Sequence, residues 1–436
     1  MQRGGGATLN NAVFIENQSR DRGGAYHVYE GGTAVFNDSL FSINSAASDG
    51  GALYVSADDI GPGPLPGNFG STAAVGRSRF EHNTAAQRGG AIYVFGPPPG
   101  NGSTVGQFLM QDSIIFGNSA DDGGGIYAQG AMSIRDSQII NNQAAFNGGG
   151  VYLAPTHVPG AMFQIAFNDF HTTVFSGNTS GSFGGGLYAN NAFANYGDVN
   201  FVSNSSGGAG GAVAIVGFSL PLSSTSFIDN ASVNSSCGGA LFAQDTGPLL
   251  LQDVTFSGNR VPSSARLGGD VCISKTNPSP IGVDLTIEHG TLYGTTAASS
   301  VHADANTTVN FVNSIVIGFG AVTCSGSGAI VSGGGNAMPP TCNPALPGDT
   351  PISSVGEVAL SPLSNHGSFT YAHIPLVGSP LIDRSACSAG RNSDQRDFEA
   401  PQDGDGNGSA ICDTGAIERQ PAELMPDIVL FKNGFE

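Results

Sequence analysis

FSINSAASDGGALY, residues 41–54, contains the two short signatures that decide the fold of this chain. In the first, Phe or Ile is followed three positions later by Asn. In the second, a Gly pair is followed by a small residue, an aliphatic residue and Tyr. The Gly-pair signature begins at Gly50, Gly89, Gly123, Gly148 and Gly184, with looser copies from Gly23, Gly210, Gly238 and Gly268. The other signature occupies Phe14/Asn17, Phe41/Asn44, Phe80/Asn83, Phe175/Asn178, Phe201/Asn204, Phe227/Asn230 and Phe256/Asn259, and Ile115/Asn118 and Ile139/Asn142 are its Ile versions.

The two signatures alternate strictly, and the step between successive Asn residues gives the repeat length. The shorter steps are 27 residues (17 to 44), 24 (118 to 142), 26 (178 to 204), 26 (204 to 230) and 29 (230 to 259). Three steps are longer, at 39 (44 to 83), 35 (83 to 118) and 36 (142 to 178). A nearly fixed period in this range indicates a stacked solenoid.

Side-chain alternation identifies the kind of solenoid. Residues 133–139 (SIRDSQI) alternate with period two, which is typical of a strand. No segment has the 3.6-residue apolar period of a helix over ten residues, and the Leu ladder of leucine-rich repeats is absent. About 26 residues, at roughly 3.3 Å each, make three short strands plus turns. We therefore predict an all-β chain, a right-handed parallel β-helix with a C-terminal capping region.

Each signature residue has an expected role in such a coil. Phe or Ile points inward and stacks on its counterpart in the next coil. The Asn lies at a tight turn, where its side chain can bond the backbone, tolerate left-handed geometry and bond the next Asn along the axis. The Gly pair permits a positive φ and leaves room in a narrow corner. The predicted structural residues are Phe41, Phe80, Phe175, Phe201, Phe227 and Phe256, with Asn44, Asn83, Asn178, Asn204, Asn230 and Asn259.

Composition and charge indicate a secreted or cell-surface protein. Gly makes up 66 of 436 residues, and charged residues only 11%, against about 25% in ordinary domains. The net charge of −19, with only 15 Lys and Arg, would repel a phosphate backbone, so we expect no nucleic-acid partner. The sequence contains no run of 18 apolar residues, so we predict no transmembrane helix. No signal peptide follows Met1, and we interpret this Met as an internal or truncated start.

The six cysteines all lie in the second half of the chain, and none has zinc-site spacing. An even number of cysteines in an exported chain favours disulfides over buried thiols. Six cysteines allow 15 connectivities. Of these we predict the sequential one, Cys237–Cys272, Cys324–Cys342 and Cys387–Cys412.

The alternating GGA[ILV] and FxxN tetrapeptides resemble the repeat of the polymorphic outer membrane proteins, over about residues 4–275. In that family the repeat region is a β-helix exposed at the cell surface and implicated in adhesion. The resemblance implies a surface or outer-membrane location in bacteria, and a glycan or a host or matrix surface as the ligand.

The three long steps each carry an insertion after the Gly-Gly-x-aliphatic-Tyr strand, at residues 56–69, 96–103 and 154–170. Insertions at one turn of successive coils project from one edge of a solenoid, which is often the binding face. Asp58, Asp59, His157 and Asp169 lie in these loops and are candidates for binding a cation or a sugar. The alternative is loop growth without function, which costs little free energy.

The C-terminal part resembles a second family. Residues 379–383 (SPLID), 394–396 (DQR) and 413–418 (DTGAIE) follow one another as in choice-of-anchor Q domains, and the resemblance covers about residues 309–420. It implies a module that caps surface β-helices next to an anchoring tail. We therefore divide the chain into a repeat region (1–300), a capping region (301–420) and a tail (421–436), whose residues 427–436 resemble the terminal GFE tails of secreted proteins.

Asp403, Asp405 and Asn407 copy the first half of a calcium-binding loop, with a Gly at the sixth position. Thr414 stands where an EF-hand has Glu, and no flanking helices are evident, so this is not an EF-hand. The alternatives are a loose calcium site and a plain Gly/Asp turn. No other cofactor is expected.

An enzymatic alternative follows from the fold, since pectin-lyase-like β-helices include polysaccharide lyases and glycoside hydrolases. Their chemistry needs carboxylates that converge on one face. By sequence, Asp136 and the pairs Asp121–Asp122 and Asp58–Asp59 do not recur at one coil position, and no Ser/His/Asp pattern is evident. We predict no catalytic residue and favour a binding or adhesive protein.

Overall fold

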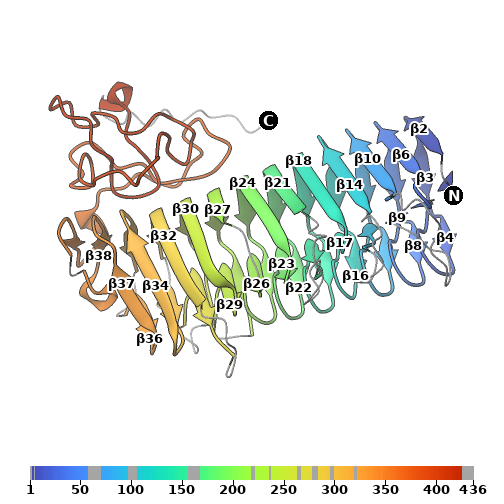
Figure 1. The fold of residues 1–436 in the computed structure, drawn as a ribbon, viewed down its shortest axis with the longest axis horizontal. Coiled ribbons are helices and arrows are strands. Elements are labelled where there is room, and N and C mark those ends of the chain that lie inside the picture. Colours follow the sequence, from blue (N-terminus) through green and yellow to red (C-terminus); the bar gives the residue numbers. More distant parts are fainter. Residues whose placement is uncertain are drawn as a thin grey trace.

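In the computed structural model the chain forms one long parallel β-helix with an irregular C-terminal region folded back along its side (Figure 1). The structure describes residues 2–3, 5–56, 70–96, 106–155, 167–217, 221–234, 237–262, 267–276, 283–294, 299–318, 322–344 and 346–424. No helix in these ranges is long and apolar enough to span a membrane. The predicted all-β parallel β-helix is confirmed.

The solenoid is built from three parallel sheets, of which two continue through the last coils and the third ends at residue 232. Sheet A is built from the strands that follow the Gly pairs. Its members are β1 (Gln2–Arg3), β5 (Tyr26–Tyr29), β9 (Leu53–Val55), β13 (Ile92–Val94), β17 (Ile126–Ala128), β20 (Val151–Leu153), β23 (Leu187–Asn190), β26 (Val213–Val216), β29 (Leu241–Gln244), β31 (Val271–Ser274), β33 (Val301–Ala303) and β36 (Cys324–Gly326).

Sheet B is the largest and ends, in each repeat coil, at the Phe or Ile signature. It contains β2 (Gly6–Asn10), β3 (Val13–Ile15), β6 (Thr33–Asn37), β7 (Leu40–Ser42), β10 (Thr72–Gly76), β11 (Arg79–Glu81), β14 (Gln107–Gln111), β15 (Ile114–Phe116), β18 (Ala131–Ile140), β21 (Phe167–Ser176), β24 (Phe193–Val202), β27 (Leu222–Ile228), β30 (Gly247–Ser257), β32 (Val283–Tyr293), β34 (Thr307–Val312), β35 (Ile315–Ile317), β37 (Ala329–Ser332), β38 (Ala337–Met338) and β39 (Thr350–Pro351). Parallel pairing thus continues past residue 300, into the segment predicted as a capping region.

Sheet C is the narrow third side, made of two-residue strands that follow the signature Asn residues from Asn17 to Asn230. Its members are β4 (Gln18–Ser19), β8 (Ser45–Ala46), β12 (Thr84–Ala85), β16 (Ser119–Ala120), β19 (Gln143–Ala144), β22 (Thr179–Ser180), β25 (Ser205–Ser206) and β28 (Ala231–Ser232). The remaining regular elements are the 3-10 turns η1 (Pro340–Cys342), η2 (Val355–Glu357) and η3 (Pro421–Leu424).

Stacked aromatic rings fill the core as the sequence predicts. The Phe41 and Phe80 rings are 4.4 Å apart at 3°, and the Phe227 and Phe256 rings 4.5 Å apart at 7°. The predicted Phe residues are fully buried, and such pairs contribute about 0.5–1.5 kcal/mol each beyond the area they bury. Ile115 and Ile139 interrupt the ring stack without leaving the core.

The Asn residues form an unbroken hydrogen-bonded ladder along the axis. In a typical rung, the backbone and side-chain N–H groups of Asn178 donate to Oδ1 of Asn204, at 3.1 and 2.9 Å. Asn204 Nδ2 in turn donates to the carbonyl of Phe175, 2.9 Å away. The left-handed residue is the one before each Asn, for example Ser203 at φ 53°, and not the Asn as we predicted. Asn is needed for its amide, because one side chain satisfies buried groups on two neighbouring coils.

Ser residues form a second hydrogen-bonded ladder beside the first. These residues belong to neither of the two sequence signatures. Ser39 N–H donates to Ser78 Oγ at 3.0 Å, Ser78 N–H to Ser113 Oγ at 3.0 Å, and Ser113 N–H to Ser137 Oγ at 3.1 Å. These hydroxyls satisfy backbone N–H groups at a bend inside sheet B.

The Gly pair is required by sterics at its corner. Gly50 has φ 64°, and a Cβ on Gly51 would overlap the backbone carbonyl of Gly90 in the next coil. The backbones of successive coils therefore touch at this corner, which only Gly permits.

The six cysteines form the three predicted disulfides. Their Cα atoms are 5.6 Å apart in Cys237–Cys272 and 5.1 Å apart in both Cys324–Cys342 and Cys387–Cys412. The first two lie in the solenoid, and the third links two segments of the C-terminal region.

Candidate functional site

A single left-handed residue bends sheet B in every coil and creates a column of side chains on the outer surface. The strand ladders place these residues in register, and each has a φ between 44° and 54°. The corner column is Asn11, Asp38, Arg77, Asp112, Asp136, Thr172, Asp198, Ser224, Asp253, His289 and Asn313. Acidic residues thus do recur at one coil position, which corrects our expectation for Asp136. This register could not be seen in the sequence, because the insertions change the number of residues between successive corner positions.

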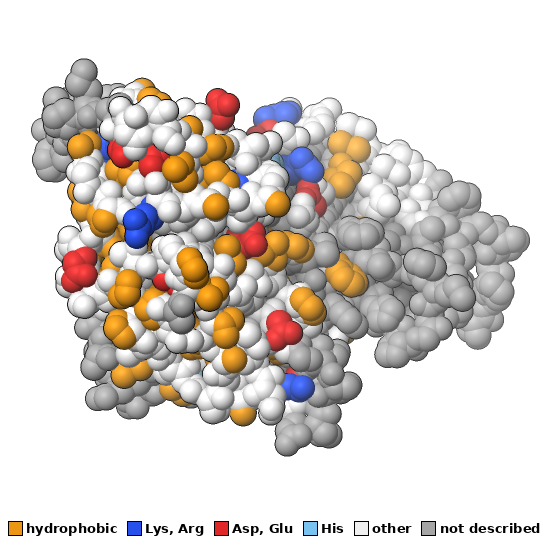
Figure 2. All heavy atoms as spheres, turned by 60° about the vertical axis from the view of Figure 1, so that its left-hand side comes forward, with side chains coloured by type: hydrophobic (Ala, Val, Ile, Leu, Met, Phe, Trp, Pro, Cys, Tyr) orange, Lys and Arg blue, Asp and Glu red, His pale blue; other side chains and the backbone are white. Residues whose placement is uncertain are grey.

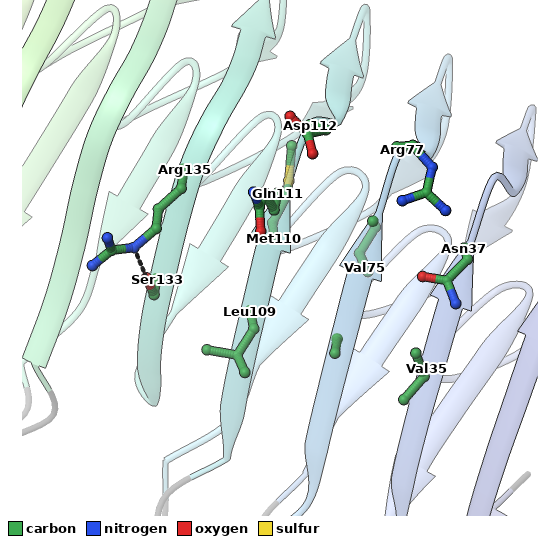
Figure 3. A pocket seen from close by; sticks show the side chains of 12 residues that line it. Val35, Asn37, Val75, Arg77, Leu109, Met110, Gln111, Asp112, Ser133 and Arg135 are labelled. Carbon is green, nitrogen blue, oxygen red and sulfur yellow. Dashed lines mark hydrogen bonds between the residues drawn. The ribbon is translucent and has the colours of Figure 1, made fainter.

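A hollow of about 300 Å³ lies on the outer face of β6, β10, β14 and β18, beside this column (Figure 3). Outward-facing side chains of four successive coils line it, and the corner residues close one side. The lining combines apolar and planar polar groups, notably Val35, Leu109, Asn37, Gln111, Arg77 and Arg135. Leu109 is 47% exposed, so an apolar contact is available to a ligand.

Ion pairs between neighbouring coils fix the two arginines of the hollow. Arg77 donates from Nε and Nη2 to the two carboxylate oxygens of Asp38, both at 2.8 Å. The hydrogen bond from Arg77 lowers the pKa of Asp38. Arg135 Nη2 donates to Asp169 Oδ2 at 2.7 Å. The guanidinium groups are thereby neutralised and oriented, while their remaining N–H groups stay at the surface.

The same outer face is covered in the later coils by the C-terminal region. There, Arg391 Nη2 donates to the corner residue Asp253 at 2.9 Å, and Asn313 Nδ2 donates to the carbonyl of Ala386 at 2.6 Å. Gln395 of the DQR segment accepts a hydrogen bond from Thr255, 2.6 Å away. The corner column is therefore open in the coils of the hollow and occupied in the last coils.

Apolar packing accompanies these polar contacts. Outward-facing side chains of the last coils join a buried cluster with residues of the C-terminal region. The cluster contains Ile315, Ile317, Ala337, Ile352, Val358 and Leu381. The molecular end that carries these coils shows few charged side chains among uncharged polar and scattered apolar ones (Figure 2).

The DQR and DTGAIE segments form the buried centre of the C-terminal region. Arg396 pairs with Asp394 at 2.9 Å, and both side chains are fully buried. Arg391 lies 3.5 Å from Glu418, whose pKa is raised by burial. These blocks hold the region together and attach it to the solenoid, so their motif reflects structure.

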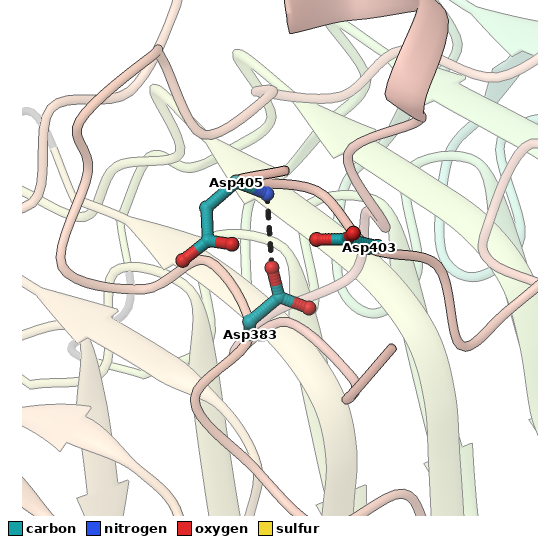
Figure 4. Close-up of side chains that lie close together, drawn as sticks. All are labelled: Asp383, Asp403 and Asp405. Carbon is teal, nitrogen blue, oxygen red and sulfur yellow. Dashed lines mark hydrogen bonds between the residues drawn. The ribbon is translucent and has the colours of Figure 1, made fainter. Parts of the chain in front are cut away.

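The predicted calcium loop contains an acidic cluster, but with a different third member. Carboxylate oxygens of Asp383, Asp403 and Asp405 lie within 4.8 Å of one another (Figure 4). The Asn407 side chain instead donates to Asp405 at 2.9 Å and accepts from Ser409 N–H. Burial raises the pKa of Asp383, and its two acidic neighbours add to this. Three carboxylates at this spacing suit a hard divalent cation.

The three predicted loops fall mostly outside the described residues, as do Asp58, Asp59, His157 and the tail at 427–436. Their positions along the chain are still informative, because residues 56–69 and 96–103 lead into β10 and β14, which line the hollow. Of the four candidate residues in these loops, Asp169 is the one that the structure describes. It lies in strand β21 and not in a loop as we predicted, and it pairs with Arg135.

The residues of the hollow were missed at the sequence level because none belongs to a signature. Arg77 and Arg135 were assigned no role from the sequence, and Leu109 and Gln111 differ from their counterparts in neighbouring coils. An apolar residue facing outward in an otherwise alternating strand, as in 107–111 (QFLMQ), is the signal that could have been used.

Comparison with known proteins identifies the repeat. Residues 38–56, 77–94, 112–129 and 172–190 each match the Chlamydia polymorphic membrane protein (Chlamydia_PMP) repeat. No curated protein and no solved structure matches the chain. The chain therefore carries polymorphic membrane protein repeats, which indicate a bacterial surface or outer-membrane protein.

Proposed function

We propose that this protein is a surface β-helix that binds a ligand, in an adhesive role, through the open outer face of sheet B. The observation that carries the proposal is the hollow over β6, β10, β14 and β18, which remains open although the C-terminal region covers the same face further along. The predicted loops 56–69 and 96–103 precede β10 and β14 in the chain, and we include them in the proposed binding surface for this reason.

A glycan of low charge fits this surface better than a polyanion or a polycation. The described arginines of the hollow are paired with Asp38 and Asp169, so little net charge faces the ligand. Amide, guanidinium and hydroxyl groups supply directional hydrogen bonds to sugar hydroxyls, and Leu109 supplies an apolar contact. A protein ligand of a host or matrix surface is the alternative occupant.

The resemblance to choice-of-anchor Q domains supports a protective role for the C-terminal region. By covering apolar residues such as Ile315 and Ile317, the region shields the last coils from self-association. Calcium at the Asp383–Asp403–Asp405 cluster would stiffen this region, and the tail at 427–436 would direct sorting. The test for the tail is export of a chain that lacks residues 427–436, which should fail.

Binding to a glycan and matrix-protein array, with and without calcium, tests the main proposal. Leu109→Asp and Gln111→Ala should abolish binding while the fold is kept, and shortening of the loops at 56–69 and 96–103 should weaken it. Ile43→Asp, at an exposed apolar residue outside the hollow, is the matched control and should bind normally. Equal binding by Leu109→Asp and the wild type would refute the site. Depolymerisation of a polysaccharide in the same wells would instead support the lyase or hydrolase alternative.

A further inference from the structure

The outer face of sheet A carries a column of side chains that changes character toward the C-terminal end. Tyr rings dominate its first part, with Tyr54 and Tyr93 stacked 5.0 Å apart at 1°. The last two positions are instead a His and a Ser. In register order the column is His27, Tyr54, Tyr93, Tyr127, Tyr152, Tyr188, Ala214, Phe242, Cys272, His302 and Ser325.

His302 connects a hydroxyl to a carboxylate. Its Nδ1 lies 2.9 Å from Ser325 Oγ, and its Nε2 lies 3.1 Å from Asp304 Oδ1. His302 is 7% exposed, whereas Ser325 and Asp304 reach solvent. The imidazole is therefore held by both nitrogens between two partners that are accessible to a ligand.

The hydrogen bonds around Ser325 allow the direction of proton donation that an activated serine needs. Gly268 N–H donates to Ser299 Oγ at 3.0 Å, and the Oγ atoms of Ser299 and Ser325 lie 2.8 Å apart, where either hydroxyl can donate. The Ser325 hydroxyl has two acceptors within reach, the Val301 carbonyl at 3.4 Å and His302 Nδ1 at 2.9 Å. When it donates to the nearer one, His302 Nε2–H donates to Asp304. This tautomer places the basic nitrogen of the imidazole on the hydroxyl of Ser325.

We propose that Ser325, His302 and Asp304 form a hydrolytic centre for carboxylic esters. Ser325 is the nucleophile and His302 the general base, both catalytic residues, and Asp304 is a positioning residue that holds the tautomer and stabilises the imidazolium. The arrangement meets the geometric requirement for an activated serine, a base within hydrogen-bond reach that is itself oriented by a third group.

The edge of the sheet supplies a donor for the developing oxyanion. β36 is the last strand of sheet A in the described part of the chain, and Val301 N–H donates to the carbonyl of Thr323 on its inner edge. The alternation of a parallel ladder directs the N–H of Gly326, the residue after the nucleophile, to the outer edge.

The reaction balances with water as the only co-substrate. Ser325 Oγ bonds to the ester carbon, the bond from that carbon to the leaving alcohol breaks, and the Ser325 proton passes through His302 to the leaving oxygen. Water then adds to the acyl carbon, its proton returns through His302 to Ser325, and the carboxylic acid leaves.

A fluorophosphonate probe, followed by peptide mapping, tests the centre on the full chain. The wild type should be labelled at Ser325 and should hydrolyse p-nitrophenyl acetate above the buffer rate. Ser325→Ala should abolish both, and His302→Gln should slow labelling about 100-fold. Asp304→Asn should slow labelling at an unchanged melting temperature, which a purely structural role would not do.

Ser332→Ala is the matched control, because Ser332 also donates to a carboxylate, Asp349 at 2.7 Å, but has no His partner among its hydrogen bonds in the described ranges. It should label like the wild type. An unlabelled wild type, or equal labelling of Ser325→Ala, would overturn the proposal. The three side chains would then be a structural hydrogen-bond ladder that continues the Tyr column.

Discussion

The N-terminal and C-terminal coils share one backbone plan but present the same face to different surroundings. Asp38 and Asp253 occupy the same corner position, with φ 51° in both. Asp38 meets Arg77 at the surface, whereas Asp253 meets Arg391 beneath the C-terminal region. The coil thus fixes where a side chain is placed, and its neighbours decide whether that place serves binding or stability.

Breaking the covered ion pair should have the largest effect. Arg391→Met leaves Asp253 buried without its cation, which typically costs about 3–5 kcal/mol. The expected result is release of the C-terminal region, measured as new proteolytic cleavage at 352–424 and a lower urea midpoint. Arg77→Met, at the exposed counterpart, should leave the midpoint unchanged. Equal effects of the two substitutions would show that the two faces are not energetically distinct.

Removing one rung of the Asn ladder should have the second-largest effect on stability. Asn204→Ala leaves the Phe175 carbonyl and the Asn178 N–H without their partner, at about 1–3 kcal/mol for each unsatisfied buried group. Chemical denaturation followed by Tyr fluorescence measures the loss. Asn17→Ala, at the exposed first rung, should cost clearly less, and a similar cost there would contradict the role of burial.

The pH dependence of stability should reveal the buried carboxyl at the end of the Asn ladder. Burial raises the pKa of Asp270, which ends the Asn ladder as acceptor of Asn259, to about 7. A raised carboxyl pKa means that the folded state holds the proton more tightly than the unfolded chain. The stabilisation is complete below about pH 4 and is lost as the pH rises through 7. The melting temperature should therefore fall between pH 5 and 8.5, and this fall should shrink in Asp270→Asn.

Calcium should stabilise the C-terminal region, by a smaller free energy than the changes above. If the cation binds at Asp383, Asp403 and Asp405, saturation at ten times the dissociation constant adds about 1.4 kcal/mol. Calorimetry should detect heat with the wild type and none with Asp403→Asn. Protection from proteolysis should be confined to the C-terminal region. A silent titration of the wild type would leave this segment as a Gly/Asp turn.

Much of the fold could be predicted because its determinants repeat. Each coil meets a near copy of itself, so Phe201 and Asn204 reveal their partners through the period alone. The Ser ladder was not predicted because Ser39 and Ser78 belong to neither of the two repeated signatures. The corner column was not predicted either. Insertions before β10, β14 and β21 change the number of residues between successive corner positions, although these positions stay in register between the coils.

The parallel β-helix and its aromatic and Asn ladders could be predicted from the sequence, since they depend on residues that recur at a near-constant step. The disulfide pairing was one choice among 15, because the cysteines follow no such step. Three features could be seen only in the folded chain: the part of sheet B that stays open, the place of Asp383 in the acidic cluster, and the position of His302 between Ser325 and Asp304. These contacts join coils or segments through side chains that do not recur from one coil to the next. The period of the sequence therefore cannot predict them. Arg391 and Asp253, 138 positions apart, meet because the C-terminal region folds back across the coils.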